Sequence, residues 1–310
     1  MNRIESFVRS FLSLAVVVAV VAPSPLWACA CGCGVFDVGM SKNMLTSPGG
    51  FVSFEYDFMN QNKNWNGNRK SSDDNNSDKD IRTNFFTGSV DYMLNRSWGY
   101  MVEVPVWQRH FETTDNNNMV GGFDRGAVGD VRVKAVYAGL SADMSTGLTL
   151  GAKLPTGPFD QPDFDRDTQI GTGSTDLLLG GYHMGRVPGL SSFNWFATAQ
   201  WDEPVLSMGG YRPGAEIAAS LGSYYEGWTA GDFKIAPLAQ VVASVRGRDS
   251  GTAADPTDSG YQRVFLFPGC EITRGAVRVY GDVGFPVYTF VNGNQLVAAE
   301  LYKLNVGWSF

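Results

Sequence analysis

The chain has 310 residues, of which 44% are hydrophobic, 18% charged and 13% aromatic, and its formal net charge is −7. The negative charge, with only 24 Lys and Arg, argues against a nucleic-acid-binding protein, which needs a basic face. Beyond residue 26 there is no run of 18 apolar residues, which excludes a helical membrane protein, and so many aromatic side chains argue against disorder.

The first residues have the organisation of a secretory signal peptide. Arg3 and Arg9 precede an apolar stretch, residues 11–22, that is too short to span a bilayer comfortably. Ala28-Cys29-Ala30 is an A-x-A cleavage pattern, so we predict that residues 1–28 are a leader, cut after residue 28 or 30. Leu26-Trp27-Ala28-Cys29 also looks like a bacterial lipoprotein signal, in which Cys29 would be lipidated.

A cluster of cysteines follows the leader. Cys29, Cys31 and Cys33 are separated by single small residues, and the fourth cysteine, Cys270, lies far away in the chain. Thiolates select soft metals such as Cu(I) or zinc, whereas the periplasm oxidises thiols to disulfides. Three interpretations therefore stay open: a soft-metal or redox site, a disulfide (for example with Cys270), and a lipidated Cys29. We expect residues 29–49 to form a Cys- and Gly-rich periplasmic segment or a plug.

From residue 50 onward, segments of about ten residues alternate apolar and polar side chains, and this pattern predicts strands with two different faces. In the last segment Tyr302, Leu304 and Val306 point one way, while Lys303 and Asn305 point the other. Twelve strands are predicted, at residues 50–60, 81–93, 98–112, 129–138, 146–155, 174–184, 193–203, 213–225, 232–246, 261–271, 276–288 and 298–310. Proline removes a ladder donor, so bulges or strand ends are predicted at Pro105, Pro237 and Pro286.

The connections between these strands alternate in length. Long polar connections, residues 61–80, 113–128, 156–173 and 247–260, follow odd-numbered strands, and most of the others are shorter. Long loops on one side and short turns on the other are typical of outer-membrane barrels, as are aromatic residues at the ends of the apolar faces. The sequence therefore predicts an all-β fold: a transmembrane antiparallel up-and-down β-barrel of about twelve strands over residues 50–310, in the outer membrane of a Gram-negative bacterium. A soluble β-sandwich is the alternative.

Three stretches resemble a known family. They are Gly129-Asp-Val-Arg-Val-Lys-Ala-Val-Tyr137, Gly147-Leu-Thr-Leu-Gly-Ala-Lys-Leu-Pro-Thr-Gly157 and Gly171-Thr-Gly-Ser-Thr-Asp176. They are similar to the outer-membrane family labelled for the meta-pathway of phenol degradation. The resemblance implies a 12-stranded transporter or porin that passes aromatic or other hydrophobic compounds. The terminal Phe310 also resembles the closing strand of bacterial outer-membrane barrels.

Charged residues on the polar faces of the strands are candidates to line a pore: Glu55, Asp57, Glu103, Arg132, Lys134, Lys153, Lys234, Arg246, Arg278 and Asp282. Opposed charges can form a constriction that sets the field of a pore, or they can pair off and block it. The outcome depends on whether residues 29–49 and 156–173 fold into the lumen.

The functional hypothesis is passive transport of a small, hydrophobic or aromatic solute, without catalysis and without a cofactor. The expected partners are outer-membrane lipid and the solute, with no nucleic acid. The alternative is a non-conducting barrel whose N-terminal cysteines bind a soft metal or a periplasmic partner. A barrel phospholipase would need a serine near His110 at the outer rim, but Glu112 stands where that nucleophile belongs.

Overall fold

The computed structural model describes residues 33–40, 47–114 and 119–310, so the whole predicted leader and both Cys29 and Cys31 lie outside the described residues. Two short 3-10 helices occur in the described residues, η1 (Cys33–Phe36) and η2 (Asp73–Asn75). None of the described helices is long and apolar enough to cross a membrane. The remaining regular structure is antiparallel strand.

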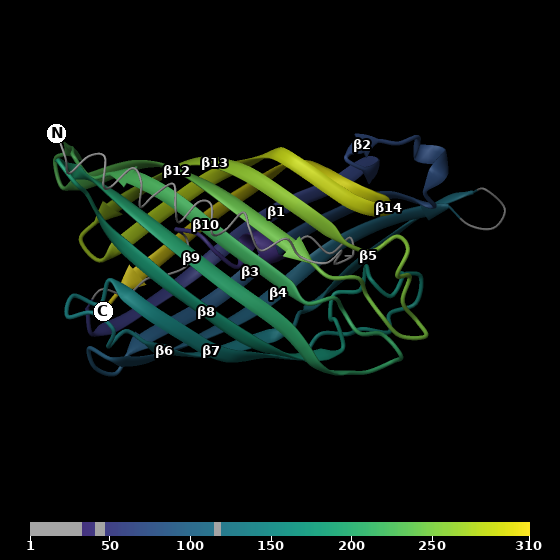
Figure 1. Ribbon diagram of the computed structural model, residues 1–310, viewed down its shortest axis with the longest axis horizontal. Coiled ribbons are helices and arrows are strands. Elements are labelled where there is room, and N and C mark those ends of the chain that lie inside the picture. The colour runs from purple at the N-terminus through teal and green to yellow at the C-terminus, as the bar shows by residue number, and fades with distance from the viewer. Residues whose placement is uncertain (1–32, 41–46, 115–118) are drawn as a thin grey trace, which may run out of the picture.

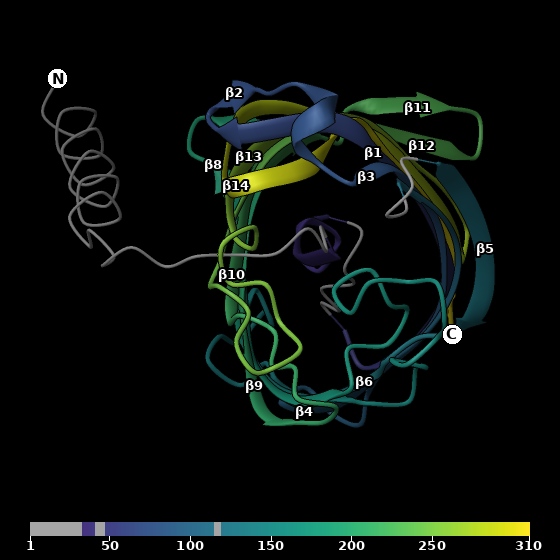
Figure 2. The ribbon, with the colours of Figure 1, turned by 90° about the vertical axis from the view of Figure 1, so that its right-hand side faces the viewer.

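The strands form one closed ring (Figures 1 and 2). Its elements are β1 (Gly49–Gly67), β3 (Asp78–Met93), β4 (Trp98–Thr114), β6 (Val131–Tyr137), β7 (Thr146–Leu154), β8 (Ser174–Val187), β9 (Leu190–Ser207), β10 (Glu216–Tyr225), β12 (Phe233–Arg246), β13 (Tyr261–Arg274) and β14 (Val277–Ser309). Pairing of β10 with β12 and of β14 with β1 closes the ring. Closure leaves no unpaired edge, which a sheet in lipid requires.

The long element β14 is a hairpin. Its first half pairs with β13, its second half pairs with β1, and the chain reverses next to Gly293, where φ is +57°. Ten single strands and the two arms of β14 therefore give the described barrel a wall of twelve strand segments. The prediction of a closed antiparallel barrel with about twelve strands is confirmed.

The two faces of the wall differ as the alternation predicted. On β1 and β14, Glu55 and Lys303 are buried inside, whereas Phe54 and Trp308 are 55% and 58% exposed outside. Exposed apolar side chains continue around the outer face and include Val104, Leu150, Ile217, Val241, Leu266 and Leu304. In water such a continuous apolar surface promotes aggregation, whereas a bilayer-spanning wall needs it. The outer face is therefore a lipid-facing surface, and the sandwich alternative is wrong.

The two ends of the barrel differ in their connections. The end that we call the turn end carries short connections, such as residues 94–97 and 275–276, together with Gly50 and Phe310, which exchange two backbone hydrogen bonds of 2.8 and 2.9 Å. The opposite loop end carries the longer connections 155–173, 208–215 and 247–260.

Several predicted loops at the loop end are largely strand. Residues 61–67 continue β1, residues 289–297 form the β14 hairpin, and residues 120–128 form β5 (Val120–Val128). Two further short strands lie outside the ring: β2 (Arg69–Lys70) pairs with β1 at the loop end, and β11 (Trp228–Ala230) pairs with the start of β12 at the turn end. The β1 extension and β5 did not show the strand pattern in the sequence, because a strand beyond the bilayer needs no continuous apolar outer face.

The predicted strand 129–138 starts later, at Val131, because of Pro105. Up to Glu103 the strand β4 pairs with β6, and from Val106 onward it pairs with β5. Pro105 lies at the switch and has no N–H to hold the partner strand, while its carbonyl accepts from Gly129 at 2.8 Å. A register shift also occurs where Pro286 pairs with Phe265, whereas the ladder runs through Pro237 without a shift.

Candidate functional site in the barrel lumen

The described N-terminal residues 33–40 lie inside the barrel. Figure 2, viewed along the barrel, shows the purple coil of η1 within the ring of strands. Phe36 is 5% exposed. The Gly39 amide donates to Thr198 Oγ1 at 3.0 Å, and the Met40 amide donates to Gln240 Oε1 at 3.1 Å. This lumen segment is thus held by inward-facing side chains of β9 and β12.

An ion pair fixes the same segment on the other side of the lumen. Asp37 pairs with Arg132 of β6, and their side chains are 8% and 18% exposed. Beside them Lys134 lies 3.3 Å from Glu103, both almost fully buried. A buried pair is costly to break because the remaining charge stays desolvated. The lumen segment is therefore anchored electrostatically as well as by packing.

The family-like stretches meet at one residue, Asp130. Its carboxylate accepts from the Gly157 amide at 3.0 Å and from the amide and hydroxyl of Thr172 at 2.9 and 2.6 Å. The Thr156 hydroxyl donates to the Gly129 carbonyl at 2.7 Å. These bonds fasten both ends of the connection 155–173 onto the break between β5 and β6, which gives the Gly- and Thr-rich motif a structural explanation.

The connection 155–173 also reaches into the lumen. Arg109, an inward-facing residue of β4, donates to the carbonyls of Thr168 and Gln169. Ile170 and Gln169 are buried and face the same cavity as the lumen segment. Residues 33–40, the described part of the N-terminal segment inside the barrel, and the connection 155–173 are thus both folded inward.

A cavity of about 100 Å³ remains between these elements. Three aromatic rings stand along it: Phe36 lies 5.6 Å from Phe85, and Phe85 lies edge-on to Trp107 at 4.8 Å, centroid to centroid. Charged side chains line the rest, among them Glu55, Asp57, Glu103, Arg132, Lys153, Asp202 and Arg246. A second cavity of about 60 Å³, more apolar, lies beyond Asp37 and Val38. The lumen therefore offers aromatic surface beside paired charges.

All ten predicted lumen charges lie on the inward-facing register. Six of them line the larger cavity: Glu55, Asp57, Glu103, Arg132, Lys153 and Arg246. Lys134 lines the smaller cavity, and Asp282 is buried beside Tyr280. Arg278 lies 3.7 Å from Glu271, and Lys234 is exposed near the turn end. Most of these charges are paired with an opposite charge, so the net electric field that an ion would meet in the lumen is weak. Their role in conduction stays a prediction.

Several charged lumen residues were not among the predicted pore-lining candidates. Lys303 and Asp176 stand at inward positions of recognised strands, so their register alone could have identified them. Asp176 pairs with Lys153, and Asp202 lines the same cavity. Asp37 had no such signal, because nothing in the sequence shows where a segment before the first strand will fold.

Two of the four predicted cysteines, Cys33 and Cys270, lie among the described residues. Cys33 begins η1, and Cys270 forms no disulfide with any described residue. Cys270 alternates with inward-facing Phe267 and Gly269 and shares the outward register of Leu266 and Ile272. The wall therefore separates its thiol from residues 33–40. Cys29 and Cys31 lie outside the described residues, so the suggested disulfide with the N-terminal cluster stays a prediction.

Two carboxyl groups meet at the loop end, beyond the apolar band. Burial, followed by the neighbouring Asp165, raises the pKa of Asp78 to about 7. Burial also raises the pKa of Asp165, although a hydrogen bond from Asp78 offsets part of this rise. Two neighbouring carboxylates cannot both ionise cheaply, so the pair holds one proton below about pH 7. This pair ties the connection 155–173 to the start of β3.

No family model and no curated protein matches the chain. Among solved structures it is similar to an outer-membrane channel from Pseudomonas putida F1, with 14% identity, a TM-score of 0.63, and coverage of 88% of this chain and 100% of that one. It is also similar to the β domain of the Bordetella autotransporter Brka (13% identity, TM-score 0.48, coverage 85% and 100%). The monoaromatic hydrocarbon channel CymD is a further similar structure (11% identity, TM-score 0.44, coverage 91% and 94%). The first likeness and the lipid-facing band identify the fold as an outer-membrane β-barrel.

Proposed function

We propose that the protein is a passive outer-membrane channel for small hydrophobic or aromatic solutes, and that it performs no catalysis. The observation that carries this proposal is the row of rings formed by Phe36, Phe85 and Trp107 along the lumen cavity. Aromatic faces bind other rings by stacking and edge contacts, with about 0.5–1.5 kcal/mol beyond area burial. The resemblance to a phenol-degradation family in the stretches around Asp130 points to the same class of solute.

The size of the cavity implies that the lumen segment moves during transport. The free space is about 100 Å³. An engineered protein cavity that binds benzene measures about 150 Å³. A benzene-sized solute therefore needs residues 33–40 to shift, and the contacts of Asp37 and Gly39 with the wall are the ones that must open. The described arrangement is accordingly a closed form of the channel.

Single-channel recording in a planar bilayer tests the proposal. Refolded protein should conduct ions, and phenol added to one side should interrupt the current briefly as it occupies the lumen. Trp107→Ala should shorten these interruptions about 2- to 10-fold, since one aromatic contact is lost. Trp201→Ala is the matched control, because Trp201 lies on the outward face and is 40% exposed.

Two results would count against the proposal in different ways. Bilayers that stay sealed although folded, heat-modifiable barrels are inserted would refute an open pathway. Currents that phenol leaves unchanged would refute the aromatic solute class while keeping the channel. The alternative role of the N-terminal cysteines stays a prediction, and metal analysis of the Cys31→Ser and Cys33→Ser variants addresses it.

A further inference from the structure

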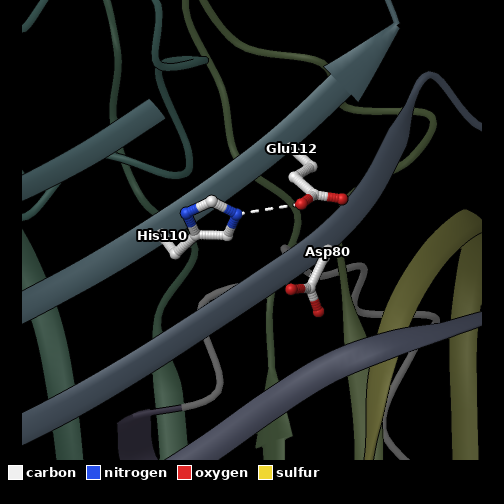
Figure 3. A group of neighbouring side chains, drawn as sticks. All are labelled: Asp80, His110 and Glu112. Atoms are coloured by element: carbon white, nitrogen blue, oxygen red, sulfur yellow. Dashed lines mark hydrogen bonds and ion pairs between the residues drawn. The ribbon is translucent and has the colours of Figure 1, made fainter. Parts of the chain in front are cut away.

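A second cluster of polar residues lies on the opposite, outward face of the wall. Asp80 belongs to β3, and His110 and Glu112 belong to β4 (Figure 3). In the register of these strands Asp80 stands directly opposite Glu112. Inward-facing Ile81 and Phe111 occupy the alternate positions and are buried. The cluster is thus separated from the lumen by the barrel wall and is independent of the proposed channel.

The height of the cluster places it above the hydrocarbon layer. The outward-facing residues of β4 are apolar up to Val106 and then become polar, with Gln108, His110 and Glu112. A tilted barrel strand rises about 2.5 Å per residue along the membrane normal, so His110 lies roughly 10 Å beyond the apolar band. Ions from the external solution and the headgroup layer can reach this level.

The geometry of the three side chains suits a metal ion. One ligand atom from each lies within 4.8 Å of the other two, and His110 Nε2 is 3.0 Å from Glu112 Oε1. Ligand atoms around a tetrahedral Zn²⁺ with bonds near 2.1 Å are separated by about 3.4 Å. Small side-chain rotations, without movement of the paired strands, would bring the three atoms to that spacing.

A fourth residue orients the histidine. His110 Nδ1 lies 2.9 Å from Asp124 Oδ1, on the neighbouring strand β5. A neutral imidazole that donates from Nδ1 to this carboxylate turns its Nε2 lone pair toward Glu112. Lone pair and carboxylate repel unless a proton or a metal ion lies between them. A carboxylate on the far nitrogen is also the usual second partner of metal-ligating histidines.

The charge balance of the cluster favours an added cation. Asp80 and Glu112 are like charges directly opposite each other, which destabilises a strand pair. Arg82 reaches only one oxygen of Asp80, Oδ2, at 3.4 Å, and the Arg82 side chain is 46% exposed. The other oxygen, Asp80 Oδ1, is buried and has no hydrogen-bond partner in the described part of the chain. This oxygen is the acceptor that a metal ion would satisfy.

We propose that Asp80, His110 and Glu112 form a binding site for a divalent transition-metal ion on the outer face of the barrel. One imidazole with two carboxylates suits Zn²⁺ better than Mg²⁺ or Ca²⁺, which prefer oxygen ligands throughout. Three protein ligands leave at least one coordination position for water or another external ligand. Asp124 is a positioning residue that acts through His110.

Zinc titration of the full chain tests the proposal. The mature protein is refolded in detergent and its thiols are alkylated, so that the cysteines cannot compete for the metal. Isothermal titration with ZnCl₂ should show one site, whose affinity falls at least about tenfold in both His110→Gln and Glu112→Gln. His183→Gln is the matched control, because His183 is the only other histidine in the sequence and lies outside the cluster. That variant should bind zinc like the wild type.

Two further readouts keep the test decisive. Asp124→Asn should weaken zinc binding about tenfold, since it removes only the orienting carboxylate. Zinc should also protect His110, but not His183, from modification by diethylpyrocarbonate, as read by mass spectrometry. The proposal is overturned if the alkylated wild type takes up no zinc. It is equally overturned if a heat-modifiable, folded His110→Gln variant binds zinc as tightly as the wild type, or if MgCl₂ competes at equal concentration.

Discussion

Lys303 Nζ lies 2.9 Å from Glu55 Oε1, across the seam where the last strand of the barrel meets the first. The same ammonium is 3.3 Å from Asp57 Oδ1, and all three side chains are almost fully buried. Lys303 also donates to the Phe36 carbonyl at 3.4 Å and lies 5.3 Å from the centre of the Phe36 ring. One cation therefore joins the closing seam of the barrel to the lumen segment.

Lys303→Met should destabilise the barrel strongly. The substitution keeps the length of the side chain but leaves the Glu55 and Asp57 carboxylates buried without their cation, which costs about 3–5 kcal/mol. Urea unfolding in detergent measures the loss. Lys234→Met is the control, because Lys234 is exposed, and its free energy of unfolding should change by less than about 0.5 kcal/mol. Equal stability of the two variants would show that the seam does not depend on this ion pair.

The barrel could be predicted from sequence because each strand separates lipid from lumen. Residues such as Leu304 and Lys303 must alternate when one face meets hydrocarbon, so the pattern gave the number of strands and the inward register of the ten charged residues. Beyond the bilayer this constraint ends. The polar strand β5, with Gly121, Gly122 and Gly126, therefore looked like a loop, and its pairing with β4 became visible only in three dimensions.

Asp37→Asn should increase the conductance of the channel. The substitution removes the partner of the partly buried Arg132. If the ion pair contributes about 3 kcal/mol, its loss shifts the equilibrium roughly a hundredfold toward the form with the lumen segment displaced. Planar-bilayer recordings of the mean current measure this shift. Asp143→Asn removes an equal charge from an exposed turn and should leave the current unchanged. A wild-type current in Asp37→Asn would mean that the ion pair does not hold the closed form.

The lumen contacts could be predicted only in part, because register fixes direction but not partners. Arg132 was expected to point inward, yet its partner Asp37 comes from a segment without strand periodicity. Asp130 was recognised within a motif, but the donors that meet it, Gly157 and Thr172, lie on a connection of irregular backbone. Such contacts depend on how a loop folds back onto the barrel, and the periodicity of hydrophobic residues in the sequence carries no information on this.

The packing of the connection 155–173 should depend on pH. The pKa of Asp78 is raised to about 7, far above its ordinary value, so the folded state binds this proton more tightly than the unfolded state. Acid therefore favours the packed connection. The free-energy cost of ionising Asp78 in the packed state is absent below about pH 4, grows as the pH rises, and reaches its full value above about pH 7. Protease cleavage within residues 156–173 should be about tenfold or more slower at pH 5 than at pH 8.

Asp78→Asn should remove most of this pH dependence, because the amide stays neutral and can still donate to Asp165. Asp255→Asn is the control: Thr257 lowers the pKa of Asp255, so that carboxylate is already ionised across the range tested. An unchanged cleavage profile in Asp78→Asn would assign the pH dependence to another group.

Gly171→Ala should detach the connection 155–173 from the barrel. A Cβ atom at Gly171 would lie 2.2 Å from the Gly157 carbonyl oxygen and 2.7 Å from the Gly157 Cα, and both are backbone atoms that cannot rotate away. The two ends of the connection must then separate, and the hydrogen bonds from Gly157 and Thr172 to Asp130 are lost. We expect faster hydrogen exchange in residues 156–173 and a larger current, since Ile170 leaves the cavity lining. Gly88→Ala is the matched control, because a Cβ there meets nothing within 4 Å. Equal exchange in the two variants would show that the glycine pair does not determine how the connection is seated.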